Sequence, residues 1–335
     1  MDILGLYIPT WNRKNQLKQL LSNILPAFEK YGLPIYISDD NSTDGTETMV
    51  KDMQSTYKKL YYKKNDTGLE KGYAANLISV LRMGHTEFAW IFGDDDLIKD
   101  GALERILPEL KNNDFLQINS EVWDSNFTKM LETRKIFVDH DTKYGKDEYN
   151  HVLLNARKGY AGFMGEIITR RAYLITELDK LAKPTLAYRD FLHTTLFFRA
   201  IVGKTGKLIA APLIKNRMDG EMKGGEFRVW VSIFPQTLEE LSPPYELDTV
   251  IKSGSLRLYS MIGITAMNKL QHPEKKPEYF NYLNHDRSIN PINRAVITLI
   301  LLSPNILNKV LISPILMAKN LKMKDSRLKP NDKQA

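Results

Sequence analysis

Segments with strand-like and helix-like patterns alternate through residues 1–120, and this alternation limits the possible folds more than any other feature of the chain. Short apolar runs predict strands at residues 3–9, 33–38, 60–62, 87–92 and 115–119. Between them, helical spacing and capping signals predict helices at residues 13–26, 44–51, 70–83 and 102–110. Strands separated by helices imply a mostly parallel sheet, and such sheets bind ligands at the carboxyl ends of their strands.

The pattern is less regular after this alternating part. Residues 121–150 are polar and irregular, residues 162–169 predict a later strand of the same sheet, and residues 185–200 are helical in part. The segment 217–225 contains three glycines and mixed charge, which predicts a mobile loop. Helical patterns follow Pro244 and continue into an apolar and basic tail.

Three consecutive carboxylates, Asp94, Asp95 and Asp96, follow the apolar strand 88–92 and Gly93. Adjacent carboxylates repel one another unless a cation neutralises them. The usual neutraliser is a divalent cation with oxygen ligands, and Mg²⁺ or Mn²⁺ at such a site is commonly accompanied by a phosphate. The run therefore indicates an enzyme that acts on a diphosphate-bearing substrate. The alternative is a solvated acidic turn, which the preceding apolar strand disfavours.

Composition excludes several kinds of site. The 335 residues include no cysteine, so disulfides, thiolate metal sites and cysteine nucleophiles are absent. The histidines form no cluster with ligand spacing, so we expect no zinc site. The net charge of +7 is concentrated beyond residue 289, where eight Lys or Arg stand against two Asp. A nucleic-acid-binding protein would spread its basic residues over a recognition face, so we expect no nucleic-acid partner.

The basic tail after residue 289 also carries many apolar residues, and three prolines divide it into short segments. Apolar helix faces beside basic residues suit an anionic membrane surface. The alternative is a set of helices that pack on the preceding domain and end in a basic extension. No apolar run approaches the roughly 18 residues of a spanning helix, and the first residues carry no signal-peptide pattern.

Four short strings lie at the ends of expected strands, in a fixed order along the chain. They read IPTWNR at 8–13, ISDDNSTDGT at 37–46, NDTGLEKGYAAN at 65–76 and FGDDD at 92–96. In this order they resemble the inverting glycosyltransferases of family 2. The resemblance covers residues 1–220 and is nearest to bacterial O-antigen and capsule sugar transferases such as the abequosyltransferase-like group. It implies the GT-A fold, an α/β fold with a Rossmann-like, mostly parallel sheet flanked by helices.

The resemblance implies a glycosyltransferase domain at residues 1–220, with a nucleotide-sugar half at 1–120 and an acceptor half at 121–220. Residues 221–335 then form a mobile loop and a smaller helical region that ends in the basic amphipathic tail. We expect a metal-dependent hexosyltransferase that uses a nucleotide-sugar donor, UDP-linked in our interpretation. Its acceptor is a hydroxyl of a saccharide or lipid-linked saccharide in bacterial surface polysaccharide synthesis. We expect it in the cytoplasm, peripheral on the inner face of the cytoplasmic membrane, and the oligomeric state stays open.

The family's donor-binding residues can be carried onto this sequence. The resemblance implies that the nucleoside contacts residues at the first two strand ends, namely Pro9, Thr10, Asp39 and Asp40. An aspartate there can accept a hydrogen bond from a uracil imide or a ribose hydroxyl. Arg13 and Lys71 are candidates to neutralise phosphate as cations, and a solvated helix face is the alternative for Lys71. Asp44 we interpret as a helix cap rather than a ligand.

The family's metal pattern is Asp-x-Asp, with the cation bridging to the donor diphosphate. Asp94 and Asp96 fit this pattern literally. An alignment from Gly101 instead makes Asp95 the main ligand. All three aspartates therefore stay candidate ligands of Mg²⁺ or Mn²⁺, and Asp94 and Asp95 are also candidate contacts of the nucleotide sugar.

Transfer requires a base that takes the proton of the acceptor hydroxyl. The family supplies an aspartate well beyond the metal run, and Asp190 lies at the matching position. The alternative for Asp190 is an ion pair, for example with Arg189. His193, one helical turn later, is a candidate ligand of metal or phosphate, with a structural histidine as the alternative.

Three residues around the glycine-bearing segment are candidates for closing the site. Arg217 and Lys223 could cover the leaving diphosphate as part of a lid. Trp230 could stack on an acceptor sugar. The alternatives are a surface loop for the two cations and a core position for the tryptophan.

Two other functions stay open. A sugar nucleotidyltransferase also needs a metal and a Rossmann-like sheet, but it would carry a glycine-rich loop after the first strand, where this chain has Thr10 to Arg13 without glycine. A non-catalytic protein could bind membranes or polyanions through the basic tail. A dehydrogenase is disfavoured because no G-x-G-x-x-G follows the first strand.

Overall fold

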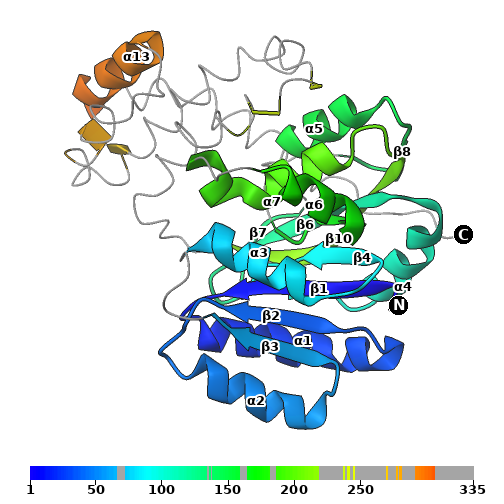
Figure 1. Cartoon of the computed structure of the whole chain (residues 1–335). Helices are drawn as coiled ribbons and strands as arrows, with labels where there is room; N and C mark the ends of the chain where they lie inside the picture. Colours follow the sequence, from blue (N-terminus) through cyan, green and yellow to red (C-terminus); the bar gives the residue numbers. More distant parts are fainter. Residues whose placement is uncertain are drawn as a thin grey trace, which may run out of the picture. The chain divides into compact units, whose positions relative to one another are not determined.

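The computed structural model divides the chain into two compact units, Met1–Gly220 and Glu221–Ala335 (Figure 1). Most of the first unit is described, and a smaller share of the second. The described residues are 1–65, 72–133, 136, 138–158, 164–181, 186–218, 237, 240–241, 244–245, 269–270, 277, 279–280 and 291–305.

The first half of the sheet consists of four parallel strands in the order β3-β2-β1-β4. These are β1 (Leu4–Thr10), β2 (Ile35–Asp39), β3 (Leu60–Lys64) and β4 (Phe88–Ile91). β1, β2 and β4 are buried along their whole length, as expected for strands that helices cover on both faces. Thr10 pairs with Asp39 and Asp39 with Lys64, so these strands end at one edge of the sheet.

The second half of the sheet continues from β4 in the order β9-β6-β10-β5. Its strands are β9 (Ile167–Arg170), β6 (Phe115–Asp124), β10 (Gly206–Met218) and β5 (Leu97–Ile98). β9 is antiparallel to both β4 and β6, β10 is parallel to β6, and β5 is antiparallel to β10. Two short strands, β7 (Met130–Glu132) and β8 (Thr142–Tyr144), pair with β6 and β10. The predicted α/β fold with a mostly parallel sheet is confirmed, and the antiparallel strands β5, β7, β8 and β9 make the sheet mixed.

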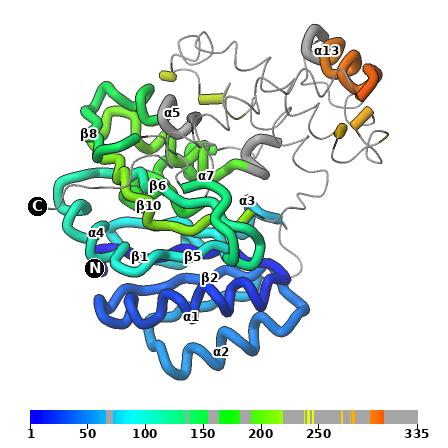
Figure 2. Tube along the Cα trace, turned by 180° about the vertical axis from the view of Figure 1, so that it is seen from behind, coloured from blue at the N-terminus to red at the C-terminus, as the bar shows by residue number. Residues whose placement is uncertain are grey.

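Helices cover both faces of the sheet (Figures 1 and 2). One face packs against α1 (Lys14–Tyr31), α2 (Thr46–Thr56) and α4 (Ala102–Ile106). A further helix, α5 (Tyr149–Lys158), contributes none of its described side chains to this core. The other face packs against α3 (Tyr73–Met83), α6 (Arg171–Asp179) and α7 (Leu186–Ala200). A 3₁₀ turn, Leu107–Asn112, follows α4. Each core lies between one sheet face and its helices, so the sheet edge stays available for a site.

The helix α1 shows how the local sequence sets an element. Leu17, Leu21 and Phe28 are completely buried at helical spacing on the face that meets the sheet. The helix runs past Pro26 to Tyr31, further than the apolar pattern predicted, because Phe28 still packs in the core. It ends at Gly32, whose φ of +61° is the left-handed C-cap that glycine adopts most readily.

In the second unit the main described element is α13 (Pro291–Leu302). Its Ile297 and Leu301 are completely buried, whereas Leu299 and Leu302 are 67% and 62% exposed. The ammonium group of Lys269 donates hydrogen bonds to the carbonyls of Ile300 and Ser303 at the C-terminal end of α13. Within the described part of the chain, no helix is both long and apolar enough to span a bilayer. The basic tail from residue 306 lies outside the described residues.

Candidate active site

The loops after β1 and β2 are joined by a group of short hydrogen bonds. The backbone N–H of Asn12 donates to Ser42 Oγ at 2.8 Å, and Asn12 Oδ1 accepts from the N–H of Thr43 at 2.8 Å. Asp44 accepts from the N–H of Lys14 at 2.8 Å, and from the N–H and hydroxyl of Thr46 at 3.1 and 2.6 Å. Its carboxylate therefore meets the positive starts of α1 and α2 together.

The environment of Asp44 agrees with its predicted role at a helix start. Burial alone would raise the pKa of Asp44, but the hydrogen bonds from Thr46 and Lys14 outweigh it and hold that pKa below its usual range. The N-cap residue of α2 by backbone conformation is Gly45, one residue later than the capping-box pattern indicates. Asp44 thus acts as a structural acceptor for two helices.

Asp39 and Asp40 lie at the carboxyl end of β2 but differ in their surroundings. Asp39 is completely buried and accepts hydrogen bonds from Ser42 N–H and Oγ at 2.8 and 2.6 Å and from the Tyr62 hydroxyl at 2.5 Å. Asp40 is half-buried, and one of its oxygens accepts from the N–H of Gly72 at 2.9 Å. Asp39 therefore holds the turn, and Asp40 is the aspartate that solvent reaches.

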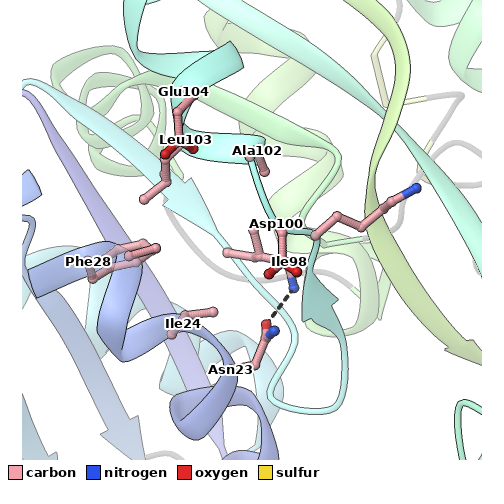
Figure 3. Close-up of a pocket in the computed structure, with 11 residues that line it drawn as sticks. Asn23, Ile24, Phe28, Ile98, Asp100, Ala102, Leu103 and Glu104 are labelled. Carbon is pink, nitrogen blue, oxygen red and sulfur yellow. Dashed lines mark hydrogen bonds between the residues drawn. The ribbon is translucent and has the colours of Figure 1, made fainter. Parts of the chain in front are cut away.

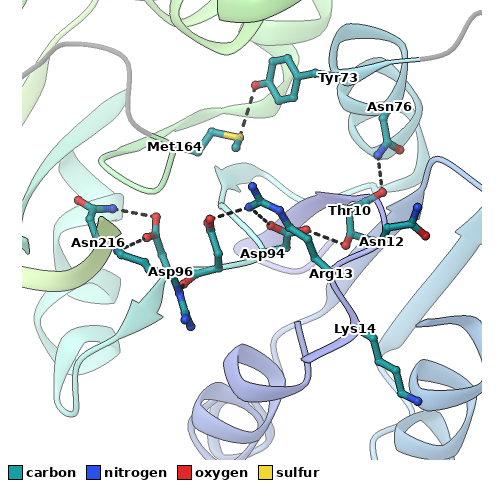
Figure 4. A network of polar contacts seen from close by, with 12 residues as sticks. Thr10, Asn12, Arg13, Lys14, Tyr73, Asn76, Asp94, Asp96, Met164 and Asn216 are labelled. Atoms are coloured by element: carbon teal, nitrogen blue, oxygen red, sulfur yellow. Dashed lines mark hydrogen bonds and ion pairs between the residues drawn. The ribbon is translucent and has the colours of Figure 1, made fainter. Parts of the chain in front are cut away.

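The acidic run begins with two carboxylates that share one cation (Figure 4). Arg13 Nη1 lies 3.0 Å from Asp94 Oδ1 and 2.6 Å from Asp95 Oδ2. The Thr10 hydroxyl donates to Asp94 Oδ2 at 2.7 Å. Burial and the neighbouring Asp95 carboxylate raise the pKa of Asp94 to about 6, although Arg13 and Thr10 both act to lower it. Arg13 thus supplies the positive charge that opposes both effects on Asp94.

Asp96 points away from this pair, toward β10 (Figure 4). Its two oxygens accept hydrogen bonds of 2.8 Å from Asn216 Nδ2 and from the backbone N–H of Arg217. The Arg217 side chain donates to the carbonyls of Asp95 and Ser125 and to Gln19 Oε1. The Arg217 side chain, which we predicted as part of a lid, is bound to the acidic turn in this structure.

The carboxylates can be compared with what a divalent cation needs. Among the described residues, the structure contains no group of three or more Asp, Glu or His side chains that could hold a metal ion. Mg²⁺ at a phosphate site, however, commonly takes one or two protein carboxylates and completes its shell with phosphate and water oxygens. Asp94 and Asp95 already converge on one cationic nitrogen, so their donor set fits such an ion. Asp96 fits less well, because its carboxylate turns toward β10, where its oxygens accept from uncharged donors, the Asn216 amide and the backbone N–H of Arg217.

His193 lies on α7, one turn after Asp190. It is 5% exposed, and its Nδ1 lies 2.6 Å from the Tyr73 hydroxyl. The two rings pack edge to face, with centroids 5.6 Å apart. This contact joins α3 to α7.

Other predicted site residues have limited or no description. The helix α7 has a non-helical backbone at Phe191 (φ −127°, ψ 31°), directly after Asp190. The Asp190 backbone belongs to α7, and its side chain lies outside the described part. Lys71, Lys223 and Trp230 lie outside the described residues.

Comparison with known proteins decides the family. Residues 6–170 match the model of Glycosyl transferase family 2, a span that contains both loops and the acidic run. This part of the chain belongs to glycosyl transferase family 2.

The chain also resembles individual curated proteins. It is 36% identical over 104 residues to abequosyltransferase RfbV of Salmonella typhimurium, which is 30% of each protein. It is 31% identical over 107 residues to the GalNAc(5)-diNAcBac-PP-undecaprenol beta-1,3-glucosyltransferase of Campylobacter jejuni, which is 32% of this chain and 34% of that protein. The matched segments thus span about a third of each relative's length.

Among solved structures, the chain resembles S. aureus TarS 1-349 in complex with UDP-GlcNAc. The TM-score is 0.55 at 17% identity, over 88% of this chain and 84% of that one. At this identity the likeness concerns the fold, and it agrees with the sheet and helix layers described above.

Two features of the family 2 domain were not predicted as site residues. Trp11, directly after Thr10, is 61% exposed at the edge where β1 ends. Glu166 is 5% exposed and accepts a hydrogen bond of 2.5 Å from the Ser120 hydroxyl. The sequence did offer a signal for each residue. Trp11 is an aromatic residue just after a predicted strand, and Glu166 is an acid within an apolar run.

A pocket on the α1 face of the family 2 domain is separate from these residues (Figure 3). It has a volume of about 110 Å³ and is lined by α1 and the segment 98–104. Asn23 Oδ1 accepts from the N–H of Ile98 there at 3.1 Å. Sites for drug-sized ligands span roughly 300–1,000 Å³, so this cavity is too small for a nucleotide sugar.

Proposed function

We propose that the chain is an inverting glycosyltransferase that moves a sugar from a nucleoside-diphosphate donor to a hydroxyl of a saccharide acceptor. The observation that carries the proposal is the pair Asp94 and Asp95 facing one cation at the carboxyl edge of a family 2 domain. Ligands of open α/β sheets bind at this edge. The names of both curated relatives, an abequosyltransferase and a glucosyltransferase, support sugar transfer in bacterial glycan synthesis.

The donor's nucleoside is assigned to the joined loops after β1 and β2. Pro9, Thr10, Asp39 and Asp40 line this edge, and the exposed ring of Trp11 offers a face on which a base can stack. Asp40 is better placed than Asp39 to accept from a base or ribose, because the carboxylate of Asp39 is buried. The UDP-GlcNAc complex of TarS supports a UDP-linked donor. Lys71 remains a proposed phosphate contact.

Asp94 and Asp95 are the proposed holders of Mg²⁺ or Mn²⁺. A bound divalent cation would neutralise the leaving diphosphate. Thr10 keeps the Asp94 carboxylate in position through its 2.7 Å hydrogen bond, and Asp96 with Asn216 keeps the turn closed. Lys223 is a proposed lid residue, and Trp230 a proposed acceptor contact.

The proposed base is Asp190. As the acceptor oxygen attacks the anomeric carbon, the Asp190 carboxylate takes the hydroxyl proton and the diphosphate leaves from the opposite face. A single displacement inverts the anomeric centre and requires no covalent sugar–enzyme intermediate. In this assignment the proposed metal ligands and the proposed base all lie within residues 1–220.

A lipid-linked acceptor is the preferred class. The name of the C. jejuni relative includes a PP-undecaprenol carrier. The exposed Leu299 and Leu302 of α13, together with the Lys- and Arg-rich tail, suit peripheral contact with an anionic membrane from the cytoplasmic side. Residues 221–335 are thus assigned to membrane and acceptor contact.

The test is a panel of UDP-, GDP-, CDP- and dTDP-sugars with the full chain and Mn²⁺. The expected result is a raised melting temperature with one nucleotide class, followed by slow hydrolysis or transfer of its sugar. Asp95→Asn is the matched inactive variant, and Asp52→Asn, on the exposed side of α2, is the control. Pyrophosphate release from a nucleoside triphosphate and a sugar 1-phosphate would instead identify a nucleotidyltransferase.

A further inference from the structure

Arg13 occupies the point at which the two acidic carboxylates converge. Its Nη1 lies 3.0 Å from Asp94 and 2.6 Å from Asp95, so one nitrogen bridges both side chains. Asp94 has a 7% exposed side chain and Asp95 a 23% exposed one. Two partly desolvated carboxylates this close to each other need a cation, and in the free protein Arg13 supplies it.

The backbone beneath Arg13 is fixed on both sides. Asn12 is bonded to Ser42 and Thr43, and the N–H of Lys14 to Asp44. The Arg13 side chain, in contrast, is 45% exposed. It can therefore turn away from the carboxylates without any movement of the loop. Asp94 would keep its bond from the Thr10 hydroxyl when this happens.

A divalent cation on Asp94 and Asp95 cannot coexist with the guanidinium in this position. Both need the same oxygens, and like charges a few ångströms apart repel strongly. Arginine has an alternative partner once a donor is bound, because its planar group pairs well with phosphate oxygens. A diphosphate next to the carboxylates would thus attract Arg13 and bring oxygen ligands for the metal.

We propose that Arg13 is a resident counter-ion that occupies the metal position of the free protein and exchanges with the divalent cation when a diphosphate binds. This inference rests on the proposed function for the identity of the diphosphate. Its consequence is positive coupling: the nucleotide raises the affinity for metal, and the metal raises the affinity for nucleotide by the same factor. The bare acidic run then binds free metal weakly.

The test is a titration of the full chain with Mn²⁺, followed by electron paramagnetic resonance or calorimetry, with UDP, with UMP or with neither. UDP should tighten Mn²⁺ binding by about 5- to 150-fold, the usual range of such coupling. UMP, which lacks the second phosphate, should have much less effect. Arg13→Gln should bind Mn²⁺ more tightly than the wild type without nucleotide. Its UDP effect should be clearly smaller than that of the wild type, because only the phosphate oxygens that ligate the metal still couple the two ligands.

Two further variants complete the design. Arg82→Gln removes an exposed arginine that pairs with Asp179 on the α3–α6 surface, and it should behave as the wild type. Arg13→Lys keeps the charge without the planar group, and should retain weak Mn²⁺ binding without nucleotide even if Arg13→Gln fails to fold.

Unchanged Mn²⁺ affinity in Arg13→Gln, equal wild-type affinity with and without UDP, or no Mn²⁺ binding at all would overturn the proposal. These readouts need no sugar transfer. Failure to transfer from any donor, with the coupling intact, would reject the proposed transferase and leave the role of Arg13 standing.

Discussion

Asn216 on β10 donates a hydrogen bond of 2.8 Å to Asp96, which lies 120 positions earlier in the chain. The contact joins the last strand of the first unit to the acidic turn after β4. Both side chains are buried, Asn216 with 1% and Asp96 with 6% exposure. The shape of the acidic turn thus depends on a strand far from it in sequence.

Replacing Asn216 with leucine should loosen this turn. Asp96 would lose a donor in a buried place, at a cost of about 1–3 kcal/mol in the free energy of unfolding. Urea denaturation of the two proteins measures this loss, and Mn²⁺–UDP binding should weaken in parallel. Lys111→Leu, at an exposed position of the 3₁₀ turn, is the control. An unchanged urea midpoint in Asn216→Leu would contradict the role given to this contact.

Asp190→Asn should abolish sugar transfer. The amide cannot take the acceptor proton, so we expect turnover to fall by about 10²- to 10⁴-fold, the usual contribution of a general base. Binding of UDP and Mn²⁺ should stay within about twofold of the wild type, because the proposed donor site lies on other elements. Single-turnover assays and calorimetry separate the two effects. Near-normal turnover in the variant would place the base elsewhere.

Chelation should stop the reaction and Mn²⁺ should restore it. EDTA removes the proposed cation from Asp94 and Asp95, and the leaving diphosphate then loses its neutralising charge. The folded protein should survive this treatment, because Arg13 and Thr10 still hold Asp94. Circular dichroism before and after EDTA tests this, and full activity in the chelator would remove the metal from the mechanism.

The stability of the fold should fall in acid through Asp114. Its carboxylate accepts from Arg170 Nε at 3.0 Å, from the Tyr173 hydroxyl at 3.2 Å and from Thr205 N–H at 3.2 Å. Burial alone would raise the pKa of Asp114, but these hydrogen bonds outweigh it and lower the pKa below 3.8. Stabilisation from a lowered pKa is complete above the unfolded value and is lost as the pH falls through the folded value.

Melting temperatures between about pH 5 and pH 2 measure this dependence. Asp114→Asn should be less stable than the wild type at pH 5, and the gap should narrow as the pH falls toward 2. Asp52→Asn, at an exposed position of α2, should follow the wild type. A gap between Asp114→Asn and the wild type that stays constant across this range would refute the assignment.

The parallel half of the sheet was predictable because β1, β2 and β4 are largely apolar, buried runs. β10 was not, although it is the longest of the described strands. Its sequence mixes Lys207 and Lys215 with Pro212, and its register with β6 shifts on both sides of that proline. The period of two is therefore broken in the sequence. β6 was predicted to end at Asn119 but runs to Asp124, because partners such as Glu166 for Ser120 and Lys99 for Glu121 satisfy its polar residues inside the fold.

The candidate site was predictable to the level of its acidic run and loops. The order of strands brings Thr10 and Arg13 to Asp94, and no local pattern contains that information. Nor does any local pattern show that Asp94, Asp95 and Asp96 have different partners. Asp96 turns toward β10 because Asn216 and Arg217 lie there, and the sequence provides no sign of that pairing.

The shared carboxylate of Asp44 has a thermodynamic consequence for whatever docks at this edge. Two helices and two loops are already immobilised around it before any ligand arrives. A nucleoside that binds there would lose its own translational and rotational entropy, but binding would not have to order the two loops as well. Association there should accordingly be rapid, with little slow rearrangement after the first encounter.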